Sequence, residues 1–191
     1  MDLRFSAVAD SATPIGLTSH VYFNLNGEGT GSAEDHLLQV PAETYLPVDD
    51  AGIPTGRPLL VAGTSFDLRE PRRLVQITRA ADPQVRLARG LDHCLVPEGS
   101  GFRRVATLAS PDSALAVSVY SDQPGLQVYT GNFLDGSVPG TSRSLYRQGD
   151  GVALEPEPFP DSPNRPDFPS AILRPGETYE AHVSWLFEGL A

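Results

Sequence analysis

The chain has 191 residues, of which 40% are hydrophobic and 20% are charged, and its net charge is −10 at pH 7. This balance is typical of a folded globular protein, and the negative charge argues against nucleic acid or an anionic membrane as a partner, because both bind basic surfaces. The single cysteine, Cys94, cannot form an internal disulfide, and no apolar segment is long enough for a signal peptide or a membrane-spanning helix. We therefore expect a single cytoplasmic domain over residues 1–191.

Alternation of apolar and polar residues dominates the chain and predicts β-strands. In chain order, the expected strands are 2–9, 36–40, 104–109, 113–121, 126–130, 151–154 and 177–187. One helix is expected, within PRRLVQITRAA at 71–81. Many short strands separated by turns, with no internal repeat, no linker and no strand–helix–strand rhythm, predict an all-β fold, an antiparallel β-sandwich.

Two stretches are expected to be loops. Residues 26–35 contain GEGTG, which we interpret as a hairpin turn rather than a phosphate-binding loop, because no buried strand precedes it and no helix follows it. Residues 155–169 are rich in proline, at Pro156, Pro158, Pro160, Pro163, Pro166 and Pro169. Because proline lacks a backbone N–H donor, this second stretch is not expected to lie in a central strand.

The chain has only four histidines: His20, His36, His93 and His182. His36 and His182 are expected to be solvated strand residues. His20 and His93 lie at predicted loop-to-strand junctions, where binding groups gather on rigid scaffolds. Taken alone, each of these two is still more often a structural residue than a functional one.

The sequence holds no HExxH motif or cysteine cluster that would bind a metal, no GxSxG motif of a nucleophilic serine, and no GxxxxGK[ST] motif of a nucleotide-binding loop. We therefore expect no metal and no cofactor. Two carboxylates are better candidates for chemistry. Asp92 directly precedes His93, and Glu155 ends the apolar run GVAL. Partial burial at the end of a strand can raise the pKa of a carboxyl such as Glu155 towards the range of a general base. The alternative is that Glu155 and Glu157 lie on an exposed turn.

Five blocks, in order, resemble the aldose 1-epimerase family. PIGLTSHVYFNLNG resembles the family's N-L-T-N-H-S-Y-F-N-L motif, and GLDHCLV resembles G-Y-D-H-N-F-V. AETYLPVDDAGIPTGRPLLVAGTSFDLREPR resembles the family's Y-L-P-V-D, I-P-T-G and V-x-G-T-P-F-D-F segments, and PGLQVYTGNFLDG and LEPEPFPDSPNRPDFPSAILRPGETY resemble its last two blocks. Together the blocks cover nearly the whole chain, so no single short motif decides the resemblance.

The resemblance implies an antiparallel β-sandwich, of the galactose mutarotase type, that binds a monosaccharide in an open cleft. It also implies a reaction, the interconversion of the α and β anomers of an aldohexose such as glucose or galactose without a cofactor. By resemblance, Glu155 is the catalytic base, His20 is the acid that protonates the ring oxygen, and Asp92 binds substrate hydroxyls. The reference pKa values of glutamate and histidine suit these roles near neutral pH.

The chain also departs from the family's pattern. The family's longer N-terminal portion, with an L-H-G-G segment that carries a second histidine, has no counterpart in this sequence. We therefore expect a sandwich incomplete at its N-terminus, with low stability or self-association through exposed edges. Within the motifs, Ser19 stands for the usual asparagine, Leu91 and Cys94 flank Asp92 in place of tyrosine and asparagine, and Pro156–Pro158 replaces T-Q-H.

Three functions remain open at this point. The first is an aldose 1-epimerase-like isomerase. The second is a catalytically impaired carbohydrate-binding relic of the same fold, and the third is an accessory domain of a sugar-processing enzyme. The retained His20, Asp92 and Glu155 favour the first. The preferred sugar is not predicted, because related aldoses differ at single hydroxyls.

Overall fold

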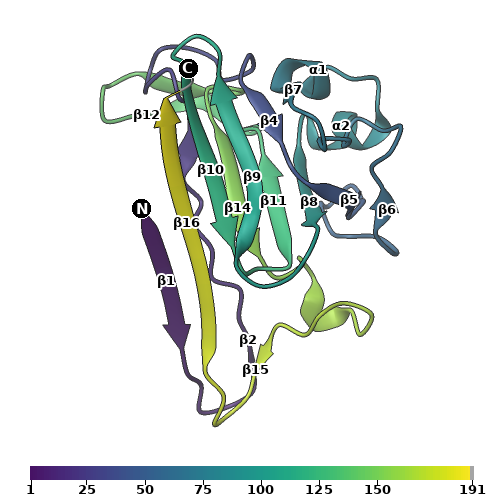
Figure 1. Ribbon diagram of the computed structural model, residues 1–191. Coiled ribbons are helices and arrows are strands. Elements are labelled where there is room, and N and C mark those ends of the chain that lie inside the picture. The colour runs from purple at the N-terminus through teal and green to yellow at the C-terminus, as the bar shows by residue number, and fades with distance from the viewer. Residues whose placement is uncertain (190–191) are drawn as a thin grey trace.

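The computed structural model describes residues 1–189, and two six-stranded sheets form its body (Figure 1). The first sheet has the order β1 (Asp2–Ala7), β16 (Tyr179–Gly189), β10 (Leu115–Ser121), β9 (Arg103–Ser110), β4 (Leu37–Gln39) and β7 (Arg72–Arg73). The second has the order β3 (Tyr22–Phe23), β14 (Val152–Glu157), β11 (Gly125–Tyr129), β8 (Asp92–Pro97), β5 (Ala42–Tyr45) and β6 (Leu59–Leu60). Neighbouring strands are antiparallel throughout, which confirms the predicted all-β class.

The main core lies between these two sheets. Leu108 and Val117 from the first sheet and Leu126 and Leu154 from the second belong to one buried apolar cluster. Because side chains alternate across a strand, each sheet can turn one apolar face to this core and leave its other face free. The outer face of the second sheet is partly covered by a second apolar cluster of Leu46, Cys94, Phe159 and Phe168. The rest of this outer face, called the free face below, is available for chemistry.

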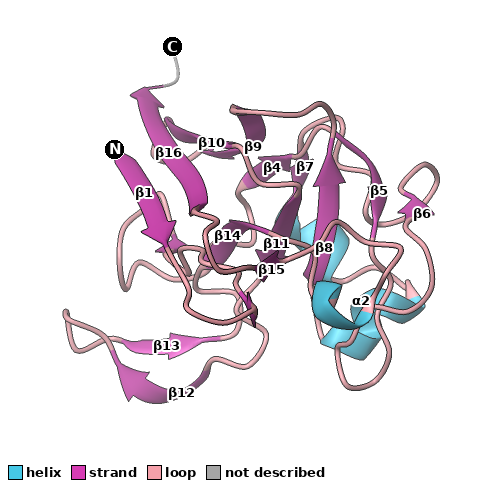
Figure 2. Cartoon of the chain, turned by 90° about the horizontal axis from the view of Figure 1, so that it is seen from below, coloured by secondary structure: helices cyan, strands magenta, loops and turns pink. Residues whose placement is uncertain are grey.

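Two small ribbons and three short helical segments complete the described chain. The ribbons are β12 (Asp135–Pro139) with β13 (Leu145–Arg147), which projects from the body in Figure 2, and β2 (Thr13–Pro14) with β15 (Ile172–Leu173). The predicted helix is present but shorter, as α1 (Leu74–Thr78), and a 3-10 turn spans Ser162–Asn164. No helix within residues 1–189 is long and apolar enough to cross a bilayer.

The helix α2 (Pro83–Ala88) was not expected from the sequence. Its six residues are too few to show a helical period, but its start carries a capping signal. The side chain of Asp82 accepts a hydrogen bond from the backbone of Gln84 at 2.9 Å, and Pro83 occupies the first turn. The side chain of Gln84 then bonds both the N–H and the carbonyl of Val48, at 2.7 and 2.9 Å, and so fixes the helix beside the second sheet.

Three local predictions were wrong. His36 is fully buried, and its Nε2 accepts a hydrogen bond from the N–H of Leu25 at 2.9 Å. His182 is half-buried, because Phe102 stacks on its ring at 4.2 Å and Asp2 lies 3.0 Å from its Nε2. Residues 26–35 do form a loop, but this loop joins strands of different sheets, β3 and β4, and is therefore not a hairpin.

The proline-rich stretch also starts later than expected, because β14 continues through Pro156 to Glu157. The strand β3 pairs only with Val152 and Ala153, so the second half of β14 has β11 as its one partner. Pro156 thus lies where the strand has a single neighbour, and its missing N–H is tolerated as on an edge strand. As a result, Glu155 lies inside a strand and not on a turn.

Candidate active site

The free face of the second sheet brings together residues that are far apart in the sequence. In the strand register, Asp92 of β8 lies opposite Tyr129 of β11, and Gln127 of β11 lies between Cys94 of β8 and Glu155 of β14. Paired residues of antiparallel strands point to the same side. Asp92, Gln127 and Glu155 therefore share one face, as the hypothesis of a single site requires.

His20 joins this face from the segment that precedes β3. The pairing of Tyr22 with Ala153 places that segment beside β14, and the Nε2 of His20 lies 3.6 Å from the Oε1 of Glu155. The His20 side chain is 51% exposed, whereas that of Glu155 is 9% exposed. The pair thus combines a shielded carboxyl with an imidazole that is open to solvent.

Two tyrosine rings flank the imidazole. The ring centroid of Tyr22 lies 4.9 Å from that of His20, and the centroid of Tyr129 lies 5.8 Å from it, nearly edge-on at 81°. The hydroxyl of Tyr129 accepts a hydrogen bond from the N–H of Phe133 at 3.0 Å, which holds this ring in place. Such aromatic contacts restrict the orientation of the histidine ring.

Gln127 was not expected at the site from the sequence. Its Nε2 donates a 2.7 Å hydrogen bond to Oδ1 of Asp92, and its Oε1 is buried with no hydrogen-bond partner among residues 1–189. A buried acceptor without a partner is unusual, and here it lies on the face that carries Asp92 and Glu155. The alternation within LQVYT was the one available signal, because it places Gln127 on the face opposite Leu126 and Val128.

Burial raises the pKa of all three carboxyls on this face. For Glu155, burial is the main cause; the neighbouring His20 lowers the pKa and the charge of Asp92 raises it again. For Asp92, the effect of burial is opposed by the hydrogen bond from Gln127 and by His20. For Glu157, burial and the charges of Glu155 and Asp92 act in the same direction and raise the pKa to about 8.

His93, the second junction histidine, lies on the opposite side of β8. It is fully buried, with its ring 4.6 Å from that of Phe66, and burial lowers its pKa to about 4. Its Nδ1 accepts a hydrogen bond from the N–H of Asp92 at 3.2 Å, and its Nε2 lies 3.2 Å from Oε1 of Gln84. His93 is therefore a neutral core residue that supports the backbone of Asp92 from behind.

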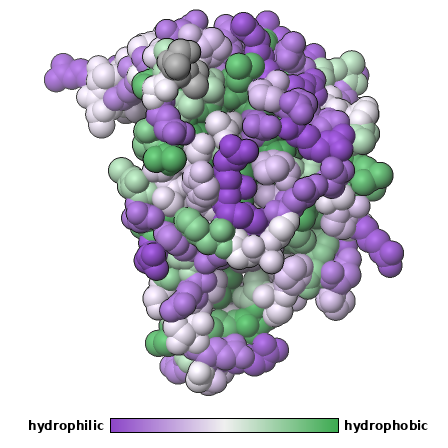
Figure 3. All heavy atoms as spheres, in the orientation of Figure 1, coloured by the Kyte–Doolittle hydropathy of each residue, from purple (hydrophilic) through white to green (hydrophobic). Residues whose placement is uncertain are grey.

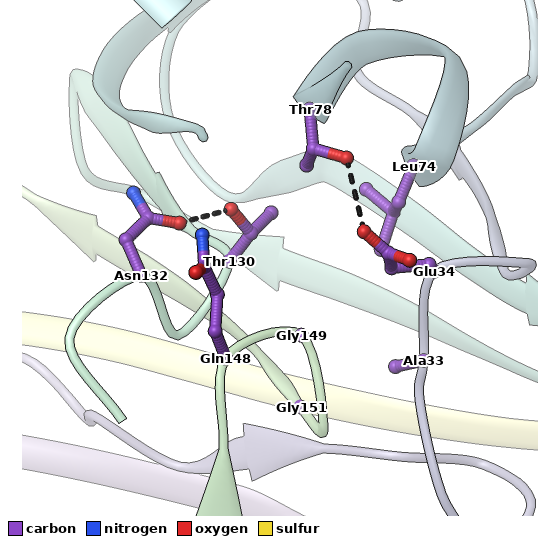
Figure 4. Close-up of a pocket in the computed structure, with 9 residues that line it drawn as sticks. All are labelled: Ala33, Glu34, Leu74, Thr78, Thr130, Asn132, Gln148, Gly149 and Gly151. Carbon is purple, nitrogen blue, oxygen red and sulfur yellow. Dashed lines mark hydrogen bonds between the residues drawn. The ribbon is translucent and has the colours of Figure 1, made fainter. Parts of the chain in front are cut away.

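A buried polar network fixes the start of β8. The side chain of Asn132 donates to the carbonyls of Ala88 and Leu91, at 2.7 and 2.8 Å, and accepts from the hydroxyl of Thr130 at 2.6 Å. Figure 4 shows this pair among the residues that line a small pocket. The pocket has a volume of about 20 Å³, which is room for one water molecule. Because Leu91 directly precedes Asp92, the network holds the carboxylate in position. The pocket itself is too small for a sugar.

The arrangement offers acid–base chemistry. Within residues 1–189, no group of three histidine, cysteine or acidic side chains has a geometry that could hold a metal ion. What the face does present is a carboxyl next to an imidazole, with an Asp92–Gln127 pair beside them. When a carboxylate and an imidazole lie this close together, the carboxylate can accept a proton from a bound molecule and the imidazole can donate one to it.

Comparison with known proteins identifies relatives along the whole described chain. A family model described as aldose 1-epimerase matches residues 1–185. The chain is 43% identical over 185 residues to the galactose mutarotase of Mus musculus, covering 96% of this chain and 52% of the relative, and 41% identical over 191 residues to the aldose 1-epimerase of Escherichia coli K12, covering 98% and 54%.

Among solved structures, the galactose 1-epimerase of Lactobacillus acidophilus has a TM-score of 0.82 at 31% identity, covering 100% of this chain and 54% of its own. An aldose epimerase homologue from C. elegans has a TM-score of 0.88 at 26% identity, covering 100% and 56%. The chain therefore spans about half the length of the relatives that it matches.

Proposed function

The chain belongs to the aldose 1-epimerase family, and from this premise we propose that it interconverts the α and β anomers of an aldohexose such as glucose or galactose. The observation that carries the proposal is the placement of His20 Nε2 3.6 Å from Glu155 Oε1 on the free face of the second sheet. The two oxygens that exchange protons in this reaction are both bonded to C1 of the sugar. A base and an acid that serve them must therefore lie side by side.

In the proposed reaction, the carboxylate of Glu155 takes the proton of the C1 hydroxyl. A carbonyl forms at C1 as the bond between C1 and the ring oxygen breaks, and protonated His20 donates its Nε2 proton to that oxygen. The open-chain aldehyde rotates about the C1–C2 bond. Ring closure on the other face of the carbonyl then reverses both transfers: His20 takes back the proton of the ring oxygen, and Glu155 gives its proton to the C1 oxygen. Both side chains therefore end in their starting states. The reaction needs no oxidant, reductant or cofactor.

The environment of each group suits its role. Burial raises the pKa of Glu155, which makes the carboxylate a stronger base than it would be in water. The half-exposed imidazole of His20 stays accessible to a bound sugar. We assign Asp92 to substrate binding, because its carboxylate lies on the same face as Glu155 and the hydrogen bond from Gln127 fixes its orientation. Carboxylate oxygens can accept hydrogen bonds from sugar hydroxyls. The Oε1 of Gln127 is itself buried, so we assign Gln127 the role of positioning Asp92.

Polarimetry tests the proposal. Freshly dissolved α-D-glucose and α-D-galactose are followed with and without the 191-residue chain, and the expected result is a first-order approach to equilibrium that speeds up in proportion to protein concentration. A rate equal to the buffer background, from protein that is shown to be folded by circular dichroism, would favour the second function considered above, a carbohydrate-binding relic.

The single domain and the cytoplasmic location are also proposals. We treat residues 1–191 as one domain, because one apolar cluster contains residues of both large sheets. The cytoplasmic location that the single cysteine predicts stays a prediction; that cysteine, Cys94, is a buried free thiol.

We also propose that the isolated chain self-associates, because it has an unpaired strand edge and exposed apolar side chains. Among the described residues, β1 pairs with β16 alone, so its outer edge offers unpaired backbone groups. Large apolar side chains near the end of β16 are exposed, with Leu186 at 47% and Phe187 at 51%, and Figure 3 shows apolar groups interspersed with polar ones on the face in view. Sedimentation velocity is expected to show species larger than a monomer that grow with concentration. A single monomeric species over the whole range would contradict this.

A further inference from the structure

Glu157 lies next to the candidate acid–base pair but has no role in the reaction described above. It follows Glu155 by two positions on β14, so the two carboxyls share the free face of the sheet. The residue opposite Glu157 on β11 is Gly125, where an added Cβ would come within 2.7 Å of the Cys94 thiol. The sheet therefore leaves no space for a side chain across from Glu157, and none is present there to pair with its carboxyl.

Among residues 1–189, the charged groups that act on the pKa of Glu157 are two acids, Glu155 of the same strand and Asp92 of β8. Cys94 of β8 and Tyr179 of β16 are neutral neighbours, close enough for the charge of Glu157 to raise their own pKa values. An open groove of about 300 Å³ also borders Glu157, and the other residues that line it are apolar or glycine, among them Pro14, Ile15, Phe159 and Ala171.

Like charges that are close together cannot easily ionise at the same time, so one carboxyl of such a cluster keeps its proton. His20 lies next to Glu155, at 3.6 Å, and stabilises the ionised form of that carboxyl. Nothing comparable acts on Glu157, because burial and its acidic neighbours all favour its protonated form. The proton is therefore held by Glu157, whereas Glu155 is free to act as the base.

We propose that Glu157 is a positioning residue for the proton transfer, a neutral carboxyl beside Glu155 whose ionisation slows the reaction. This proposal rests on the proposed function. In each turnover Glu155 must both take and release a proton. When Glu157 loses its own proton, a second negative charge beside Glu155 makes that release less favourable. The rate is therefore expected to fall as the pH rises through about 8, where Glu157 ionises.

Infrared difference spectroscopy tests the protonation without any need for activity. The carbonyl stretch of a protonated carboxylic acid is recorded for the wild-type chain and for Glu157→Gln, which is similar in size and cannot ionise. We expect the wild type to show an extra band at neutral pH that disappears with a midpoint near pH 8. Glu155→Gln is expected to lower that midpoint, because it removes a neighbouring charge. Identical spectra for the wild type and Glu157→Gln, or an unchanged midpoint in Glu155→Gln, would overturn the proposal.

Thermal unfolding gives a second measurement. A carboxyl whose pKa is 4.5 in the unfolded chain and about 8 in the folded one stabilises the fold fully below 4.5 and loses this contribution as the pH rises to about 8. The wild type should therefore lose Tm relative to Glu157→Gln across this range. A constant difference in Tm would show that Glu157 does not hold a proton.

The pH profile of kcat/KM then connects Glu157 to the reaction. Above about pH 8 the ratio of the wild-type kcat/KM to that of Glu157→Gln is expected to fall by up to roughly tenfold, which corresponds to a shift of one pKa unit at Glu155. The ratio isolates the effect of Glu157, because both proteins share every other ionisable group, including the acid His20. Glu98→Gln, at an exposed position, is the matched control and should keep the wild-type profile. A ratio that stays constant across pH 8 contradicts the proposal while leaving the function intact, whereas failure of the function itself appears as no enzyme rate at any pH.

Discussion

Replacing Glu155 with glutamine is expected to lower kcat/KM for anomer interconversion by about 10²- to 10⁴-fold, the usual contribution of one general base. Glutamine has the same shape but cannot take the proton of the C1 hydroxyl. The loss should appear mainly in kcat, because the proposed substrate-binding carboxylate, Asp92, and its hydrogen bond from Gln127 are unchanged. Polarimetry at several concentrations of α-D-galactose separates kcat from KM.

Stability measurements show whether a loss of this kind comes from the chemistry. The pKa of Glu155 is raised in the folded chain, so this carboxyl stabilises the fold less and less as the pH rises above its unfolded value of 4.5. Glu155→Gln should therefore be at least as stable as the wild type at neutral pH. Wild-type turnover in a folded Glu155→Gln protein would remove Glu155 from the role of base.

Replacing His20 with glutamine is expected to have an effect of similar size, about 10²- to 10⁴-fold on kcat/KM. The glutamine amide can donate a hydrogen bond but cannot transfer a proton. The ring oxygen must then leave C1 as an unprotonated alkoxide or be protonated by water. The half-exposed side chain of His20 is not part of the core, so little stability should be lost. Steady-state polarimetry together with the Tm of the variant measures both effects.

His182→Gln is the matched control for His20. His182 lies on β16 in the first sheet, where it contacts Asp2 and Phe102, and its replacement should leave kcat/KM close to the wild-type value. If the two histidine variants lose activity to the same extent, the loss is a general consequence of altered folding, and the assignment of His20 as the acid fails.

The fold was largely predictable because its strongest signal is local. Alternation along segments such as 113–121 and 177–187 fixes which side chains face the core, and these segments became β10 and β16. The helix α2 escaped detection because its six residues carry a capping signal but no period. Pro156 was expected in a loop but lies in β14. A strand tolerates proline where one of its sides is unpaired, and no local sequence pattern shows which sides are paired.

Three residues of the candidate site were named from the sequence, but their spatial arrangement was not. The resemblance selected His20, Asp92 and Glu155, and the strand register brings Asp92 and Glu155 to one face. The sequence did not reveal that Gln127 lies between β8 and β14, because its position depends on pairing between strands that are distant in the chain. The local pattern alone did not distinguish His93 from His20, because both lie at or just before the start of a strand. The structure places His93 in the core and His20 beside Glu155.

The central claim, that Glu155 and His20 together open and close a sugar ring, is tested most directly by NMR exchange spectroscopy on an equilibrium mixture of galactose anomers. The measurement reports interconversion itself and needs no net change in concentration. The account predicts exchange cross-peaks between the α and β C1 signals that grow with the concentration of the 191-residue chain and vanish for both Glu155→Gln and His20→Gln. Folded wild-type chain that produces no exchange above the buffer, or equal exchange in either variant, would contradict it.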